Sequence, residues 1–144
     1  MFALLRRLFA LTSRGKVDTG AAAEEAAARW LEKERGFRIA VRNWRNPDDR
    51  REELDLVAHD GDVLVFVEVK ARARGAFVPG YYAVNRRKKN VLRRAITSYL
   101  RRLREKPRTF RLDVVEVVPA VEGKGPLEVL HFENIPLFPK HFRP

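Results

Sequence analysis

The stretch EELDLVAHDGDVLVFVEVK, residues 52–70, decides the fold class because it predicts a β-hairpin. Two apolar-rich runs flank Asp60-Gly61, a dipeptide favoured in two-residue hairpin turns. With the turn at these two residues, the expected register sets Glu53 opposite Glu68. Side chains alternate between the two faces of a strand, so one face of this hairpin is wholly apolar and has to be covered.

Charged side chains gather at the far end of the other face. They are Glu53, Asp55, Glu68 and Lys70. Like charges that face each other across strands are destabilising, and a divalent cation would relieve the repulsion. Mg²⁺ is commonly held by one or two carboxylates, with waters and substrate phosphate completing its shell. The residues alone also allow an exposed ion-pair cluster in which Lys70 neutralises Glu68.

The rest of the chain predicts one α/β domain with a mixed sheet. Helical periodicity and capping residues predict helices over 19–35 and 86–105, the second one stopped by Pro107. Strands are expected at 37–44, 53–59, 63–70, 110–118 and 127–132. Residues 17–135 therefore form the expected domain, preceded by an amphipathic segment at 1–16 with helical spacing and followed by a Pro-rich tail at 136–144.

Composition limits the classes of function. The 144 residues contain no Cys, which excludes disulfides and thiolate metal sites and fits a cytoplasmic location. No apolar run approaches the roughly 18 residues of a membrane span. The net charge of +11 lies in one segment, since residues 70–111 hold fifteen Lys or Arg and a single acid, Glu105. Such a field attracts polyanions, although a solvated basic face is the alternative interpretation.

Two further acids are candidates for the same site. Glu24 borders the buried seam of the first helix and points toward the sheet, although an acid at a helix N-terminus also complements the helix dipole. Asp48, directly after Pro47, is an alternative acid, but the hairpin places Asp55, not Asp48, near Glu68.

The ELD and EVK triplets, twelve residues apart, resemble the PD-(D/E)xK nuclease signature. Together with TGAAAEEAAARWLEKERGFRIAVRNWR at 19–45 and AVNRRKKNVLRRAITSYL at 83–100, the chain resembles the YraN-like family of bacterial proteins over about residues 19–118. This resemblance implies a restriction-endonuclease-like α-β-β-β-α-β core similar to that of Holliday junction resolvases.

The resemblance also implies roles for individual residues. Asp55, Glu68 and the Val69 carbonyl would hold Mg²⁺ or Mn²⁺, with Glu53 beside them. Lys70 would activate the attacking water or stabilise charge at the phosphate, and Glu24 would be an additional ligand or water-positioning group. Lys88 aligns with a basic position of the family and could contact the substrate. The basic face of the second helix and the residues after EVK add further candidate nucleic-acid contacts, namely Arg72, Arg74, Arg86, Arg87, Arg93, Arg94 and Arg101.

The expected function is metal-dependent endonucleolytic hydrolysis of DNA, selective for structure rather than sequence, because phosphate contacts do not read bases. The alternative is a nucleic-acid-binding protein without catalysis on a nuclease scaffold, since fold does not fix function. RNA as the ligand, or an acidic protein partner for the basic face, stays open. A homodimer also stays open, with the N-terminal segment or the apolar IPLF at 135–138 as its interface.

Overall fold

A computed structural model describes residues 8–9, 19–72, 84–118 and 127–144. Six strands form one sheet in the order β1-β6-β5-β4-β3-β2, with one parallel pair, β4 and β5. The strands are β1 (Leu8–Phe9), β2 (Arg38–Arg45), β3 (Glu53–Asp60), β4 (Val63–Ala71), β5 (Thr109–Val118) and β6 (Leu127–Phe132). Helices α1 (Thr19–Arg35) and α2 (Arg86–Arg102) complete the expected α/β class and its α-β-β-β-α-β order.

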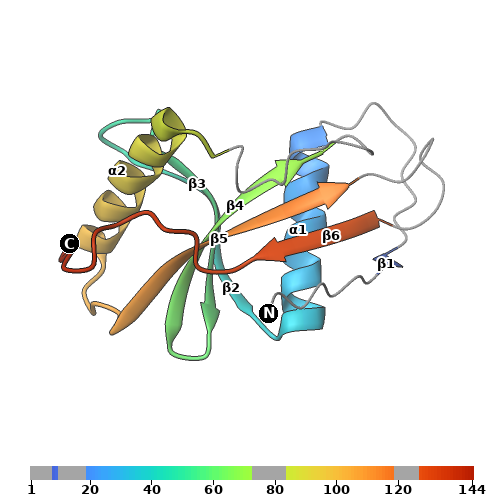
Figure 1. Ribbon diagram of the computed structural model, residues 1–144. Coiled ribbons are helices and arrows are strands. Elements are labelled where there is room, and N and C mark those ends of the chain that lie inside the picture. Colours follow the sequence, from blue (N-terminus) through green and yellow to red (C-terminus); the bar gives the residue numbers. More distant parts are fainter. Residues whose placement is uncertain (1–7, 10–18, 73–83, 119–126) are drawn as a thin grey trace.

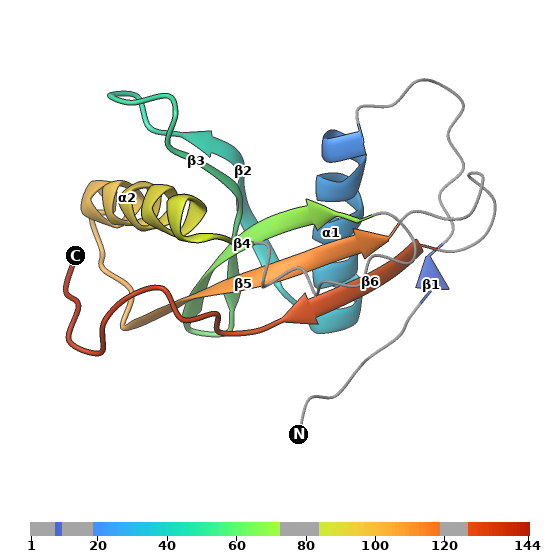
Figure 2. The ribbon, with the colours of Figure 1, turned by 45° about the horizontal axis from the view of Figure 1, so that its top comes forward.

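The two helices cover opposite faces of the sheet (Figures 1 and 2). Ala27, Trp30 and Leu31 of α1 are buried against one face. Leu92, Ile96 and Leu100 of α2 are buried against the other. Both faces are therefore core, which explains why β4 is apolar on both sides until it reaches Glu68. Within the described part of the chain, neither helix is long and apolar enough to cross a membrane.

The hairpin register differs from the predicted one by two residues. Asp60 pairs with Val63, so the turn is Gly61-Asp62, and Gly61 has a φ of +56°. Glycine at the first turn position supplies this left-handed conformation without steric cost. A shift of two residues does not by itself move side chains to the other face, but it removes the predicted pairing of Glu53 with Glu68. Continued beyond Leu56 and Val67, where the pairing ends, the observed register sets Asp55 opposite Glu68.

The predicted alternation of faces breaks at Asp55. Leu56 packs in the α1-side core, whereas Leu54 packs in the α2-side core, although both were expected on one face. The partner strand contains Asn43, which has a φ of +50° and lies between the pairs Arg42–Leu56 and Trp44–Leu54. A left-handed residue in a strand turns the following side chains, so the β2–β3 ribbon changes faces at this point.

The N-terminal and C-terminal segments both differ from the sequence prediction. Leu8 and Phe9 were expected in a helical segment but pair as a strand with Leu127 and Glu128 of β6, because this edge strand offers free backbone groups. The other residues of 1–16 lie outside the described residues. At the C-terminus, Leu137 is buried in the α2-side core, so the apolar IPLF expected as an interface packs within the chain.

Helix α2 is three residues shorter than predicted. It ends at Arg102, not Glu105, and Leu103 already has an extended backbone. The Lys106 ammonium donates to the carbonyls of Leu100 and Leu103 at 2.6 and 3.0 Å. A cation that satisfies the last carbonyls stabilises this end of the helix without a further turn.

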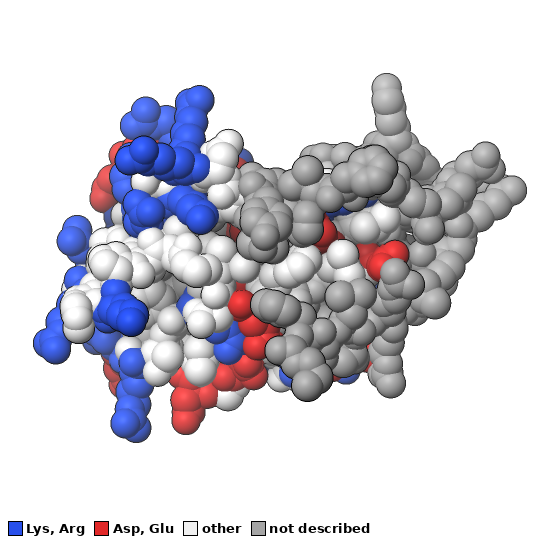
Figure 3. All heavy atoms as spheres, in the orientation of Figure 1, with Lys and Arg blue, Asp and Glu red and all other residues white. Residues whose placement is uncertain are grey.

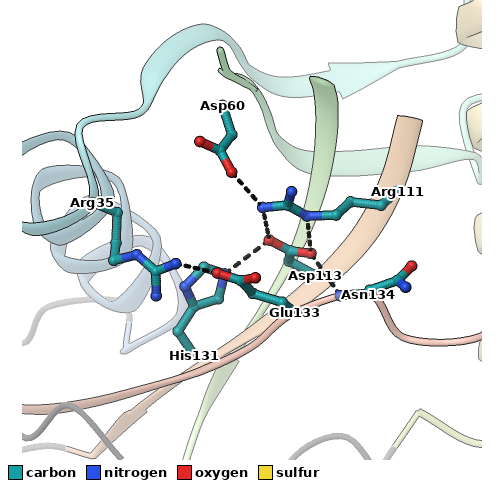
Figure 4. A network of polar contacts seen from close by, with 7 residues as sticks. All are labelled: Arg35, Asp60, Arg111, Asp113, His131, Glu133 and Asn134. Atoms are coloured by element: carbon teal, nitrogen blue, oxygen red, sulfur yellow. Dashed lines mark hydrogen bonds and ion pairs between the residues drawn. The ribbon is translucent and has the colours of Figure 1, made fainter. Parts of the chain in front are cut away.

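A buried polar network centres on Asp113, and beside it Arg35 at the end of α1 forms an ion pair with Glu133 (Figure 4). The Asp113 carboxylate is fully buried and accepts from Arg111, from the Asn134 N–H and from the His131 ring. These partners hold the pKa of Asp113 below its usual value in spite of burial. Arg111 also reaches Asp60 at the hairpin. Sequence reasoning missed this network because its members are distant in sequence and carry no recognisable spacing.

Candidate functional site

Glu68 is the centre of the charged cluster. It lies near the end of β4 and is 3% exposed. Its Oε1 is 3.0 Å from the Lys70 ammonium and 3.2 Å from the Lys88 ammonium. Its Oε2 is buried and has no hydrogen-bond partner among the described residues. The pairing of Lys70 with Glu68 was an expected alternative, but burial of Glu68 rules out an exposed cluster.

Asp55 lies beside Glu68. Its Oδ2 accepts a 2.8 Å hydrogen bond from the Val69 N–H, next to Glu68 on β4. Burial, followed by the negative charge of Glu68 and then of Glu24, raises the pKa of Asp55 to about 7, while the Val69 hydrogen bond and the charge of Lys88 act in the opposite direction. These interactions bring together four charged side chains from three elements, which Figure 1 labels. They are Asp55 of β3, Glu68 and Lys70 of β4, and Glu24 of α1.

A cleft opens next to Asp55 between the start of α1 and the β2–β3 ribbon. Its lining includes Glu24, Asn43, Arg45, Glu53 and Asp55. Glu53 forms an ion pair with Arg45 at 3.1 Å, so the predicted contact of Glu53 with Glu68 is wrong. The cleft thus brings three predicted acids to one opening, where Arg45 neutralises Glu53.

The Glu25 side chain of α1 is 41% exposed. It pairs with Arg29 and Arg42, and these hydrogen bonds hold its pKa below the usual value. The neighbouring acids Glu24 and Glu25 therefore have different surroundings, and only Glu24 lines the cleft.

The carboxylate pair fits a hard divalent cation. Glu68 Oε2 is a buried acceptor without a donor in the described part of the chain, and burial together with the charge of Glu68 raises the pKa of Asp55. Oxygen donors of this kind are the ligands that Mg²⁺ and Mn²⁺ prefer. Among the described residues, however, no three acidic or histidine side chains come close enough to form a complete ligand set. Waters and substrate oxygens would have to complete the shell.

The predicted nucleic-acid contacts divide into two groups. Arg72 pairs with the buried Glu116 at 3.1 Å, and Lys88 pairs with Glu68, so both have partners inside the protein. Arg93 donates to the Leu137 carbonyl. In contrast, four predicted contacts are exposed on α2, namely Arg86, Arg87, Arg94 and Arg101. Arg74 lies outside the described residues.

The exposed arginines form a basic surface over α2 (Figure 3). Asp48, the sequence alternative to Asp55, lies near the end of the same helix, where its side chain is 84% exposed and pairs with Arg102 at 2.6 Å. It belongs to the 46–51 loop. The structure therefore brings Asp55, not Asp48, next to the buried carboxylate of Glu68.

Comparison with known proteins identifies the family. The model of the uncharacterised protein family UPF0102 matches residues 23–117. The chain belongs to this family. A UPF0102 protein of Beutenbergia cavernae is 45% identical over 117 residues, which cover 81% of this chain and 96% of the relative. One from Symbiobacterium thermophilum is 45% identical over 105 residues, covering 73% and 86%.

A third UPF0102 relative, from Pelotomaculum thermopropionicum, is 44% identical over 115 residues, covering 80% of this chain and 92% of its own. The family match confirms the expected YraN-like membership. The matched range of UPF0102 includes Glu24, Asp55, Glu68 and Lys88 and ends before β6 and the C-terminal tail.

Proposed function

We propose that this protein is a metal-dependent endonuclease that hydrolyses phosphodiester bonds, with DNA as the substrate. The observation that carries the proposal is the half-buried Asp55 beside the buried Glu68, with Lys70 on the same strand end. Placing a second carboxylate beside a buried one is costly unless cations compensate the negative charge. The basic surface of α2 supports a polyanionic substrate.

Asp55 and Glu68 would hold Mg²⁺ or Mn²⁺, with the Val69 carbonyl and Glu24 as the further predicted contributors. When bound, such a cation polarises a phosphoryl oxygen and lowers the pKa of a nearby water. Lys70 is held at 3.0 Å from Glu68, so its ammonium is positioned at the edge of the carboxylate pair. From there it stabilises negative charge that develops on the phosphate during hydrolysis.

Lys88 supplies a second ammonium group at the same edge. This residue comes from the first turn of α2 and shares Glu68 Oε1 with Lys70. Its side chain is partly exposed, at 29%, so it can reach a phosphate that approaches the carboxylate pair. Lys88 therefore links the carboxylate site to the basic surface of α2.

The first test uses linear and branched DNA with Mg²⁺ or Mn²⁺. We expect cleavage by the wild type and at least about a 100-fold slower rate in Asp55→Asn and Lys70→Ala, since positioned ionisable groups contribute about 10²–10⁴-fold. The matched control is Asp48→Asn, which makes the same chemical change at an exposed acid. Equal rates in all variants would assign the cleavage to a contaminant and reject the site.

A second candidate function is nucleic-acid binding without hydrolysis. It is favoured by the two lysines at Glu68, which partly neutralise the cluster without any metal. The same experiment separates the two functions. Binding that survives in every variant, with no cleavage by the wild type in either metal, supports the binding protein.

A further inference from the structure

A second hollow lies at the opposite end of α2 from Lys88. It separates the C-terminal half of the helix from the C-terminal tail. We call it the tail groove and define it by Arg94, Thr97, Ser98, Arg101, Phe138 and Phe142. Neither phenylalanine lies within the range matched by the family model, and neither was predicted from the sequence to contact nucleic acid.

The exposed charge of the tail groove is positive. Arg101 is exposed and has no ion-pair partner among the residues that the structure describes. The Arg94 side chain is 63% exposed, and its Nε is 3.8 Å from the nearest carboxylate oxygen, on Glu52. Glu52 itself is buried and accepts from Asn46 and Ser98, so the acid in the floor is already satisfied.

The arginines of the groove continue a line along the helix. Arg87, Arg94 and Arg101 are spaced by seven residues, which places them on one stripe with about 10 Å between successive residues. Lys88, next to the first of them, contacts Glu68. The stripe therefore leads from the carboxylate site to the tail groove over about 20 Å, the axial length of about six nucleotides of a duplex strand.

The tail side of the groove carries an aromatic pair. The rings of Phe138 and Phe142 have centroids 4.2 Å apart and an interplanar angle of 30°. Phe110 packs edge-on against both, at 5.5 and 6.3 Å. Phe142 is only half-buried, so part of its ring lies open to the groove. Aromatic rings beside basic side chains are the combination that binds unpaired bases with their phosphates.

We propose that the tail groove binds a single-stranded segment of nucleic acid, with phosphates on Arg94 and Arg101 and an unpaired base stacked on Phe142. This inference rests on the proposed function in taking nucleic acid as the substrate. It identifies the part of the substrate that binds along α2 at a distance from the cleavage site. It gives the enzyme a preference for DNA that has unpaired nucleotides about 20 Å from the bond to be cut.

The test measures binding without divalent metal, so it does not depend on catalysis. The probes are a fluorescein-labelled 20-nucleotide single strand and a blunt duplex of the same sequence, followed by anisotropy. We expect Phe142→Ala and Phe142→Leu to weaken single-strand binding about 5- to 150-fold, the range for loss of one stacked base, and to change duplex binding less than about twofold. Unchanged single-strand binding, or equal losses for both probes, overturns the proposal.

The salt dependence of binding distinguishes the contribution of the arginines from that of the Phe142 ring. For the single strand, Arg94→Gln with Arg101→Gln should lower the slope of log affinity against log salt by about 1.4, because each phosphate contact contributes about 0.7. Phe142→Leu should leave that slope unchanged. The matched controls are Arg38→Gln and Arg42→Gln on β2, which remove the same charge outside the tail groove. A similar slope change in the controls overturns the proposal.

The two proposals fail in different ways. A protein that binds through the tail groove but never cuts DNA contradicts the nuclease and leaves the groove intact. A protein that cuts in an Asp55-dependent manner, with binding indifferent to Phe142, contradicts only the groove. Circular dichroism melts of each variant exclude unfolding as the cause of a loss.

Discussion

At the scale of single residues, the two oxygens of Glu68 have opposite surroundings. Oε1 lies between two ammonium groups, and Oε2 is buried without a donor from the described residues. A buried acceptor without a partner costs about 1–3 kcal/mol, which a protein selected for stability alone would avoid. Together with the raised pKa of Asp55, this makes the carboxylate pair the candidate functional site of the described residues.

The raised pKa of Asp55 predicts a pH-dependent stability of the metal-free protein. The folded-state pKa is about 7 against an ordinary value of 3.8, so the folded state binds this proton more tightly. The contribution of Asp55 to stability is therefore complete below about pH 4 and is lost as the pH rises through 7. Between about pH 5.5 and 8 we expect a loss of about 2 kcal/mol relative to Asp55→Asn.

Urea unfolding of both proteins in EDTA at these two pH values measures this loss. The Asp55→Asn variant is the control for the wild type, because asparagine keeps the shape of the side chain but cannot release a proton. Parallel changes of unfolding free energy in the two proteins would contradict the assignment of the shift to Asp55.

At the scale of elements, the decisive feature is the change of faces in the β2–β3 ribbon. Asn43, with its positive φ, lies between the pairs in which the side chains switch from one core to the other. The same switch places Asp55 at the mouth of the cleft. The local backbone of an edge strand thus positions a residue of the candidate site.

This role of Asn43 predicts a contrast between two substitutions. Asn43→Val should destabilise the protein by about 1–2 kcal/mol, because a β-branched residue resists the left-handed conformation. Asn43→Gly should change the unfolding free energy by only a few tenths of a kcal/mol, since glycine accepts this φ. Chemical denaturation measures both. A valine variant as stable as the glycine variant would show that the strand adopts a regular conformation at no cost.

Most elements and the acidic cluster could be predicted from the sequence, since they depend on local patterns. The alternation in β4 and the seam of α2 determine which side chains are buried, and a two-residue error in register left Asp55 and Glu68 together. The contacts of Glu53 and the end of α2 could not be predicted. They depend on the partners Arg45 and Lys106, whose positions follow from tertiary structure.

At the scale of the whole molecule, the tail is part of the α2-side core. Ile135 and Leu137 are 8% and 7% exposed, and the Ile135 N–H donates to the Leu112 carbonyl of β5 at 2.7 Å. The Arg93 side chain fixes the tail from the helix by donating to the Leu137 carbonyl at 2.6 Å. These residues therefore brace α2 against the sheet, although Leu137 lies beyond the predicted domain.

A core substitution in the tail should consequently affect the whole protein. Leu137→Ala removes a buried side chain and is expected to cost about 2–5 kcal/mol of unfolding free energy. The neighbouring Pro136 is exposed and provides the matched control Pro136→Ala, for which we expect less than about 0.5 kcal/mol. Thermal melts followed by circular dichroism measure both, and equal melting temperatures would contradict a structural tail.

The irregularity of β2 has one more consequence, for the behaviour of the protein in concentrated solution. An outermost strand offers unpaired amide and carbonyl groups to any other strand that approaches it. In β2 the register shifts between Ile39 and Val41, and Arg38, Arg42 and Arg45 project along it. A bent, cationic edge strand of this kind is a poor template for the addition of a strand from another molecule. We therefore expect it to reduce aggregation through this edge of the sheet.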